Sequence, residues 1–212
     1  MHLILASTSP RRAQLLRSVG LPFTLAPVDY EEPAPDAEDA RQPARYVERL
    51  ARAKAAACDL SALQGAQFTP HATLIVLTAD TIVWHEGRIL NKPRDANEAC
   101  EMLKALRGQT HQVFTGVCLR IHNKENKESG DDYRIEHDVT TVKFFHMDAH
   151  WIERYVATGE PMDKAGAYAA QGLGAFIIER VEGDFSNVVG LPLGRLGQML
   201  AAIGTPGEMW WM

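Results

Sequence analysis

An almost unbroken apolar run from Thr73 to Trp84 constrains the fold of this chain more than any other stretch. Such a run is typical of a central strand that is buried on both faces by neighbouring elements. Two polar residues, Asp80 and Thr81, interrupt it. A buried, unpaired carboxylate costs several kcal/mol, so Asp80 must be paired, metal-bound or placed at an open end of the strand. Two interpretations stay open: a loop-capping aspartate, or a carboxylate in a functional cleft.

The start of the chain predicts a strand, a hydroxyl-rich loop and a helix. Leu3–Ala6 is a short apolar run, Ser9 suits an N-cap, and Pro10 suits the first helical position. Arg11 and Arg12 then fall in the first helical turn, where the positive end of the helix dipole disfavours cations. Free backbone N–H groups, hydroxyls and two guanidiniums at one point suit a bound phosphate. The alternative is a pair of solvated or carboxylate-paired arginines.

Apolar periodicity and capping residues predict further helices and strands in irregular alternation. Helices are expected from residue 43 to about 58, from 95 to 108, from 148 to 159, and around Leu196. Strands are expected at 112–121 and 135–145, with hairpin turns at 86–87 and 182–184. This order predicts an α/β fold with a mixed, twisted sheet flanked by helices.

The segment from residue 22 to 43 is acidic and interrupted by prolines, which predicts a solvated loop. Because it follows the cationic start of the first helix, it could also bring a carboxylate-held metal to the same phosphates. Lys54 shares the apolar stripe of the next helix with Val47 and Leu50. It either extends to solvent at the rim of the helix or points its ammonium into a cleft.

Charge and composition exclude several classes of protein. The net charge of −5 leaves no broad basic field, so we expect no nucleic-acid partner. Cys58, Cys100 and Cys118 lie far apart in apolar stretches, which predicts reduced core residues and no disulfide or zinc framework. The opening residues lack the basic region of a signal peptide, and no apolar run approaches membrane-spanning length. We therefore expect a cytoplasmic protein with no membrane partner.

A series of short motifs, in order along nearly the whole chain, resembles the Maf family of nucleoside triphosphate pyrophosphatases. The motifs lie at 6–12 (Ala-Ser-Thr-Ser-Pro-Arg-Arg), 31–32, 52–55, 79–81 (Ala-Asp-Thr), 92–94, 108–113, 115–116, 163–168, 171–172 and 187–192. Each motif alone is weakly specific, but ten in register are highly specific. The departures are a predicted variable hairpin tip at 123–134 and a tail at 205–212.

The resemblance implies a single domain over residues 1–212 with two lobes around an elongated cleft, similar to inosine triphosphate pyrophosphatases. It implies metal-dependent hydrolysis between the α- and β-phosphates of a nucleoside triphosphate, and a homodimer. The tryptophans of the tail would suit cover by a second subunit. The Pro-Arg-Arg, Ala-Asp-Thr and Gln-Gly motifs resemble the branch that acts on dTTP and UTP. The alternatives are the branch that prefers 7-methyl-GTP, or a non-catalytic nucleotide-binding regulator of cell division.

The residues that match the family motifs carry side chains suited to this chemistry. The expected triphosphate ligands are Ser7, Ser9, Arg11, Arg12, Lys54 and Lys92. Glu32 and Asp80 are hard oxygen ligands suited to Mg²⁺ or Mn²⁺, and Asp80 is expected to activate the attacking water. A carboxylate is a weak base at neutral pH, so metal ligation alone is the alternative role for Asp80. Thr81 and Gln171 are expected to hydrogen-bond to the edge of uracil or thymine.

The neighbouring pair Asp163 and Lys164 leaves two interpretations open. Both residues fall in a glycine-rich motif that would let a backbone approach a ligand closely. They either contribute to the site directly or form an ion pair that shapes the cleft.

Overall fold

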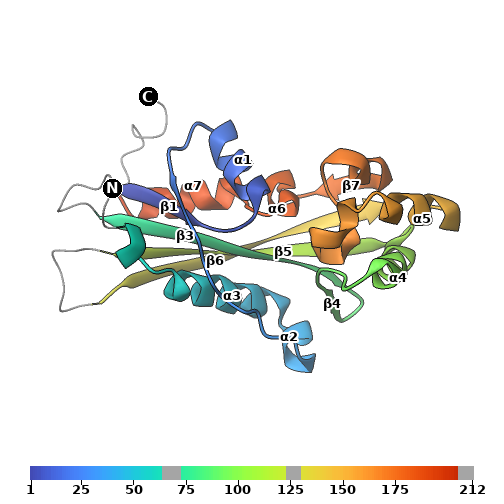
Figure 1. Cartoon of the computed structure of the whole chain (residues 1–212), viewed down its shortest axis with the longest axis horizontal. Helices are drawn as coiled ribbons and strands as arrows, with labels where there is room; N and C mark the ends of the chain where they lie inside the picture. The colour runs from blue at the N-terminus through green and yellow to red at the C-terminus, as the bar shows by residue number, and fades with distance from the viewer. Residues whose placement is uncertain (64–72, 123–129, 205–212) are drawn as a thin grey trace.

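The computed structural model describes residues 1–63, 73–122 and 130–204, and its centre is one seven-stranded mixed sheet (Figure 1). The strand order is β2-β1-β3-β5-β6-β7, and β4 pairs with β3 beside this path. Strand β1 is parallel to β2 and β3, and the other pairs are antiparallel. The strands are β1 (His2–Ala6), β2 (Thr24–Ala26), β3 (Leu74–His85), β4 (Arg88–Leu90), β5 (Thr110–His122), β6 (Asp132–Phe144) and β7 (Ile178–Glu182).

Helices cover both faces of the sheet, which confirms the predicted α/β class. Helices α2 and α3 lie on one side of the long strands, and α1, α6 and α7 lie on the other (Figure 1). The α-helices are α1 (Pro10–Ser18), α2 (Ala37–Arg41), α3 (Pro43–Ala57), α4 (Ala96–Leu106), α5 (Ala149–Ala157), α6 (Phe185–Val189) and α7 (Leu193–Ala202). Short 3₁₀ turns are η1 (Ser61–Leu63), η2 (Glu160–Asp163), η3 (Ala165–Ala167) and η4 (Gly172–Ile177).

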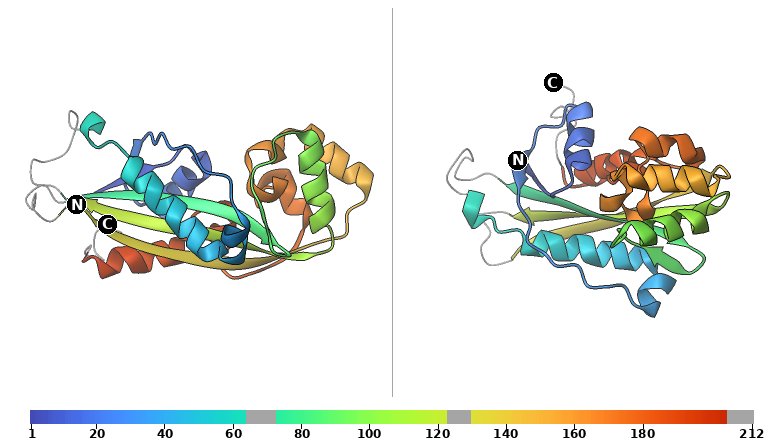
Figure 2. Two further views of the ribbon diagram at one scale, coloured as in Figure 1. Left: turned by 90° about the horizontal axis from the view of Figure 1, so that it is seen from below. Right: turned by 45° about the vertical axis from the view of Figure 1, so that its right-hand side comes forward.

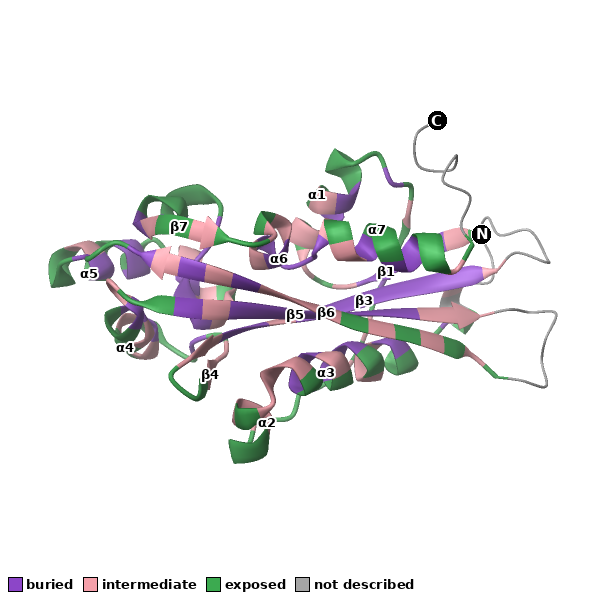
Figure 3. Cartoon of the chain, turned by 180° about the vertical axis from the view of Figure 1, so that it is seen from behind, coloured by how far each residue is buried: buried purple, intermediate pink, exposed green. Residues whose placement is uncertain are grey.

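The molecule is elongated and has two lobes joined by β3, β5 and β6 (Figures 1 and 2). In the first lobe, Leu5 and Leu77 of the sheet pack with Leu16 of α1 and with α7. In the second lobe, α4 and α5 pack on the far ends of the long strands around Phe144. Strands β3 and β5 are buried along most of their length (Figure 3). The predicted central strand is confirmed.

Helix α3 lies unusually close to the sheet at Gly116 of β5. A Cβ atom at this position would lie 2.3 Å from the backbone oxygen of Val47. Gly116 pairs with Asp80 across the β3–β5 ladder. The missing side chain therefore lets α3, which carries Lys54, pack directly over the part of β3 that contains Asp80.

The prediction of a solvated loop from residue 22 to 43 is confirmed for residues 27–36, which form no helix or strand, and is wrong on either side of them. Thr24–Ala26 forms β2 and pairs with β1, and Asp36 caps α2 by accepting hydrogen bonds from the backbone N–H groups of Glu38 and Asp39. Three of the acids that indicated a loop thus belong to a capped helix start. The segment is also tied to the rest of the fold, because Tyr46 Oη donates to the Pro33 carbonyl at 3.2 Å.

The predicted hairpin around residues 182–184 is also wrong. Strand β7 pairs with β6, but the chain after it forms α6 and does not return as a strand. Asp184 caps α6, because its carboxylate accepts from the backbone N–H of Ser186 at 2.7 Å. The capping aspartate decides between helix and strand here, and apolar composition alone did not distinguish them.

Ser9 occupies the N-cap position of α1 as predicted, but its side chain makes no capping hydrogen bond. Cys58 and Cys118 are buried free thiols, Cys100 is partly buried and free, and burial raises the pKa of Cys118 to about 12. In the described ranges, no helix has the length and apolar character needed to span a bilayer. Most of the predicted hairpin tip (123–129) and all of the 205–212 tail lie outside the described residues.

Candidate functional site

The site forms where the edge of β3 lies between two short partner strands. Strand β1 pairs with β3 up to Leu77, and β4 pairs with it again only from Val83. Within the described residues, no strand covers this edge between those two positions. Asp80 and Thr81 lie in that interval, next to the loop that follows β1. The interruption of the apolar run thus corresponds to an opening in the sheet edge, which lines a cleft of about 720 Å³.

Asp80 and Thr81 project to different sides of the strand, because successive side chains of a strand alternate. Asp80 is 4% exposed and contacts the ammonium of Lys54, with Oδ1 and Nζ 2.5 Å apart. Glu32 Oε1 lies at the same distance from the same nitrogen. Lys54 therefore points into the cleft and does not extend to the rim of its helix. It bridges two carboxylates from segments distant in sequence.

Thr81 belongs to a second hydrogen-bond network centred on Arg12. The Arg12 guanidinium donates from Nε to the Gly190 carbonyl at 2.8 Å, and from Nη2 to Thr81 Oγ1 at 3.2 Å. Its Nη1 donates to Ser7 Oγ at 3.3 Å. Burial lowers the pKa of Arg12. The attraction of Asp80 and Glu32 acts in the opposite direction but is smaller. The guanidinium thus ties the loop after β1 to β3 and to the segment after α6.

Two buried residues without a predicted role support this network. Thr115 Oγ1 lies 3.0 Å from Thr81 Oγ1 and donates to the backbone oxygen of Asn187 at 3.1 Å. The Asn187 amide is fully buried and donates to the Val113 carbonyl at 3.0 Å. Both residues lie in the motifs at 115–116 and 187–192, but no role was predicted for either of them. The available signal was a polar side chain within an apolar stretch, and that signal does not say which partner the side chain meets.

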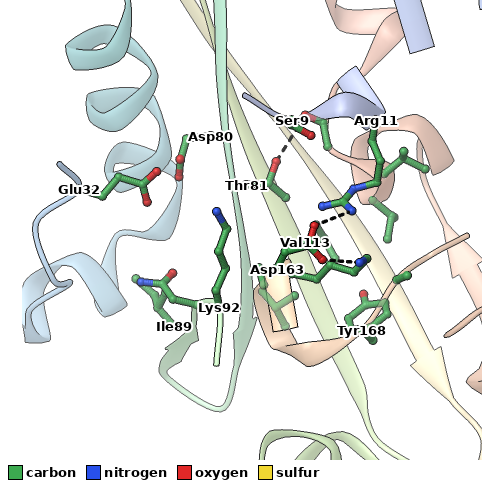
Figure 4. Close-up of a pocket in the computed structure, with 18 of the residues that line it drawn as sticks. Ser9, Arg11, Glu32, Asp80, Thr81, Ile89, Lys92, Val113, Asp163 and Tyr168 are labelled. Atoms are coloured by element: carbon green, nitrogen blue, oxygen red, sulfur yellow. Dashed lines mark hydrogen bonds and ion pairs between the residues drawn. The ribbon is translucent and has the colours of Figure 1, made fainter. Parts of the chain in front are cut away.

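Arg11 lies on the side of the cleft opposite Glu32 and Asp80, and its side chain contacts Asp163 on η2 (Figure 4). Its Nη1 is 3.3 Å from Asp163 Oδ2, and Asp163 Oδ1 is 2.5 Å from Lys164 Nζ. Partial burial alone would raise the pKa of Asp163, but the two cations Lys164 and Arg11 hold it below its ordinary value. The predicted ion pair of Asp163 and Lys164 is present. The contact of Asp163 with Arg11 connects the first lobe to the second.

The remaining predicted residues line the cleft from several directions. Ser9 lies at the start of α1, Lys92 follows β4, and Gln171 precedes η4. The Lys92 side chain points toward the space between Glu32, Asp80 and Thr81 (Figure 4). Of the ten residues expected to bind substrate or metal, only Ser7 does not itself line the cleft among the described residues, and it contacts Arg12, which does.

Apolar side chains line the cleft together with the charged ones. Tyr168, Val83, Val113 and Val188, which belong to the core cluster of the second lobe, are among them. Tyr168 is buried and its hydroxyl lies 2.9 Å from His111 Nε2. Such a mixed lining suits a ligand that has a charged part and a flat, less polar part.

Comparisons with known proteins place the chain among close relatives. A family model described as Maf-like protein matches residues 2–203. A dTTP/UTP pyrophosphatase from Symbiobacterium thermophilum is 47% identical, over 97% of this chain and 95% of the relative. A dTTP/UTP pyrophosphatase from Moorella thermoacetica is 44% identical, over 98% of this chain and 97% of the relative.

Among solved structures, a nucleoside-triphosphatase (dITP/XTP pyrophosphatase) from Mycobacterium abscessus aligns with 98% of this chain and 100% of its own. The sequence identity is 14% and the TM-score is 0.35.

Proposed function

Because the chain belongs to the Maf-like protein family, we propose that it is a pyrophosphatase that hydrolyses dTTP and UTP to the monophosphate and pyrophosphate. The relatives that bear this name match it over nearly their whole length. One observation carries the proposal: a carboxylate pair, Glu32 and Asp80, lies in the same cleft as Arg11, Arg12 and Lys92. Phosphate binding needs only the cations, whereas hydrolysis also needs groups that activate water.

The carboxylate pair fits a divalent cation. Glu32 and Asp80 already converge on one positive charge, the Lys54 ammonium. The described residues contain no group of three or more His, Cys, Asp or Glu side chains that could hold a metal. Glu32 and Asp80 are the residues that would hold Mg²⁺ or Mn²⁺, since these ions prefer carboxylate oxygens as ligands. Bound there, the cation supplies charge neutralisation and polarisation at the α-phosphate.

The chain's own residues have distinct roles in this proposal. Asp80 accepts a proton from the attacking water, or acts only as a metal ligand. Arg11, Lys92 and the Ser9 hydroxyl bind the triphosphate and offset the charge that develops on the leaving pyrophosphate. Arg12 donates three of its five N–H groups to Gly190, Thr81 and Ser7. Its fixed guanidinium keeps a positive charge at this end of the cleft.

Base recognition is assigned to the part of the cleft lined by Gln171 and Tyr168. The exposed amide of Gln171 can match the alternating donor and acceptor groups of thymine or uracil. Thr81 is the second residue assigned to the edge of the base, and its hydroxyl accepts a hydrogen bond from Arg12 Nη2 at 3.2 Å. The aromatic ring of Tyr168 and the valines beside it would cover a face of the base.

Turnover of a panel of nucleotides tests the proposal. The purified protein is given dTTP, UTP, CTP or 7-methyl-GTP with Mg²⁺ or Mn²⁺, and ³¹P NMR distinguishes pyrophosphate from phosphate. We expect dTTP and UTP to give the monophosphate and pyrophosphate. Turnover of 7-methyl-GTP alone would replace the substrate assignment by the other branch. Tight binding without turnover would favour the nucleotide-binding regulator.

The cytoplasmic location and the homodimer belong to the same proposal. Phe176 is 77% exposed, and Phe145 and Phe185 are also exposed, so apolar surface is available for a second subunit. Light scattering coupled to gel filtration tests the dimer, and a monomer mass at micromolar concentration would contradict it.

A further inference from the structure

The segment that carries Gln171 is held in place by two residues that do not line the cleft. Tyr155, on α5, accepts a hydrogen bond from the backbone N–H of Ala169 at 3.1 Å. Glu160, at the start of η2, accepts from the backbone N–H groups of Leu173 at 3.1 Å and Gly174 at 2.8 Å. Gln171 lies between these anchored positions, so its backbone is fixed on both sides.

The two anchors are also joined to each other. Tyr155 Oη donates to Glu160 Oε1 at 2.9 Å, and Tyr155 is only 3% exposed. Partial burial alone would raise the pKa of Glu160, but its hydrogen bonds with Gly174, Leu173 and Tyr155, and the nearby Lys164, hold it below its ordinary value. The carboxylate therefore stays ionised and accepts all three hydrogen bonds at neutral pH.

The chain after Gln171 is folded tightly around the Tyr155 hydroxyl. A Cβ atom at Gly174 would lie 2.2 Å from the Ala169 carbonyl oxygen and 2.6 Å from Tyr155 Oη. Only glycine permits this close approach. The backbone from Ala169 to Gly174 thus takes one conformation over the Tyr155–Glu160 pair, with the Gln171 side chain exposed at the rim of the cleft.

The same turn is connected to the phosphate end of the cleft. Lys164 Nζ donates to the backbone oxygen of Glu160 at 2.6 Å and contacts Asp163, which reaches Arg11. The turn η2 therefore contacts both the segment that carries Gln171 and a predicted triphosphate ligand.

We propose that Tyr155 and Glu160 are positioning residues for base selectivity, because their hydrogen bonds to the 169–174 backbone hold the Gln171 amide where it meets the nucleobase. This inference rests on the proposed function. A positioning role of Tyr155 and Glu160 differs from a merely structural role in one measurable way. Loss of structure would reduce turnover of every nucleotide by a similar factor. Loss of position would reduce the preference for dTTP over CTP.

The test compares kcat/KM for dTTP and CTP in the full chain with Mg²⁺. The variants are Glu160→Gln and Tyr155→Phe, and the control is Glu153→Gln, on the exposed side of α5. We expect the dTTP-over-CTP ratio to fall about tenfold or more in both variants, since a displacement of about 1 Å is enough for large losses. The control keeps the ratio of the unaltered protein. Tyr155→Phe removes a single oxygen, so it preserves the test if Glu160→Gln does not fold.

Introducing Glu160→Gln into a Gln171→Ala variant shows whether Glu160 affects the dTTP-over-CTP ratio through Gln171. There, Glu160→Gln should leave the ratio unchanged within about twofold, because the group it positions is gone. An unchanged ratio in both single variants, or an equal loss for dTTP and CTP, would overturn the inference, as would a Gln171→Ala variant that keeps its preference. If the unaltered protein hydrolyses neither nucleotide, the proposed function fails. The inference is then judged on the ratio of the Kd values for dTTP and CTP in the same variants.

Discussion

Replacing Lys54 by Met should destabilise the protein markedly, although the residue is a functional candidate. Lys54 is the partner of a carboxylate in the interior: its ammonium lies 2.5 Å from Asp80, which is 4% exposed. Met has nearly the same shape and length but no charge. The Lys54→Met variant would therefore leave Asp80 buried without the cation that contacts it directly.

The expected magnitude follows from this burial. Removing one member of a buried ion pair costs about 3–5 kcal/mol, because the remaining charge is uncompensated. For a chain of this size, about 1 kcal/mol corresponds to ~2–4 °C in Tm, so the Tm should fall by roughly 6–20 °C. The contact with Glu32 contributes little to this figure, because the side chain of Glu32 is 42% exposed.

Urea and thermal unfolding of four proteins measure the effect: the unaltered chain, Lys54→Met, Asp80→Asn, and the double variant. Asp80→Asn leaves Lys54 paired with Glu32, and the double variant contains no unpaired buried charge. We expect the free energy of unfolding of the double variant to exceed that of Lys54→Met by about 2 kcal/mol or more. The control Lys92→Met alters an exposed lysine and should change stability by less than about 0.5 kcal/mol. A Lys54→Met variant as stable as the unaltered chain, or a double variant no stabler than Lys54→Met, would refute the reasoning.

Two further predictions concern residues beneath the site. Burial lowers the pKa of His111 from 6.5 to about 3. As the pH falls below about 6.5, the imidazole is therefore protonated in the unfolded chain but stays neutral in the folded chain. This should cost roughly 2 kcal/mol of stability between pH 6.5 and 5. In His111→Gln, the urea midpoint should therefore fall less steeply over this pH range than in the unaltered chain. The exposed control His150→Gln keeps it, and an unchanged slope in His111→Gln would contradict the assignment. Gly116→Ala places a Cβ 2.3 Å from the Val47 oxygen and should cost about 1–3 kcal/mol by forcing α3 outward. A Tm equal to that of the unaltered chain would argue against this close approach.

Local patterns predicted most of the secondary structure, because each pattern has a local physical cause. The apolar run from Thr73 to Trp84 became β3, since both of its faces are covered. Helices were predicted to begin at residues 95 and 148, and Asp95 and Asp148 cap α4 and α5 by accepting from the backbone N–H groups of Glu98 and Trp151. A cap depends on residues three positions apart, so the sequence contains the whole interaction.

Interactions between distant segments were predicted less well. The direction of Lys54 had two interpretations, and only the approach of Glu32 and of β3 decides between them. Strand β2 was missed because its partner is β1, and such a short strand is defined by pairing more than by its own composition. The roles of Tyr155 and Glu160 were missed for the same reason: their partners are backbone groups of a later loop.

The effect of Asp80→Asn on dTTP hydrolysis tests the central claim most directly. Steady-state hydrolysis of dTTP with Mg²⁺ is compared between the unaltered chain and Asp80→Asn, together with the Kd for dTTP and the Tm of both proteins. We predict that Asp80→Asn folds, binds dTTP within about tenfold of the unaltered affinity, and loses at least ~100-fold in kcat, as expected for loss of a general base or metal ligand. A folded Asp80→Asn variant that retains kcat within a few-fold would contradict the account.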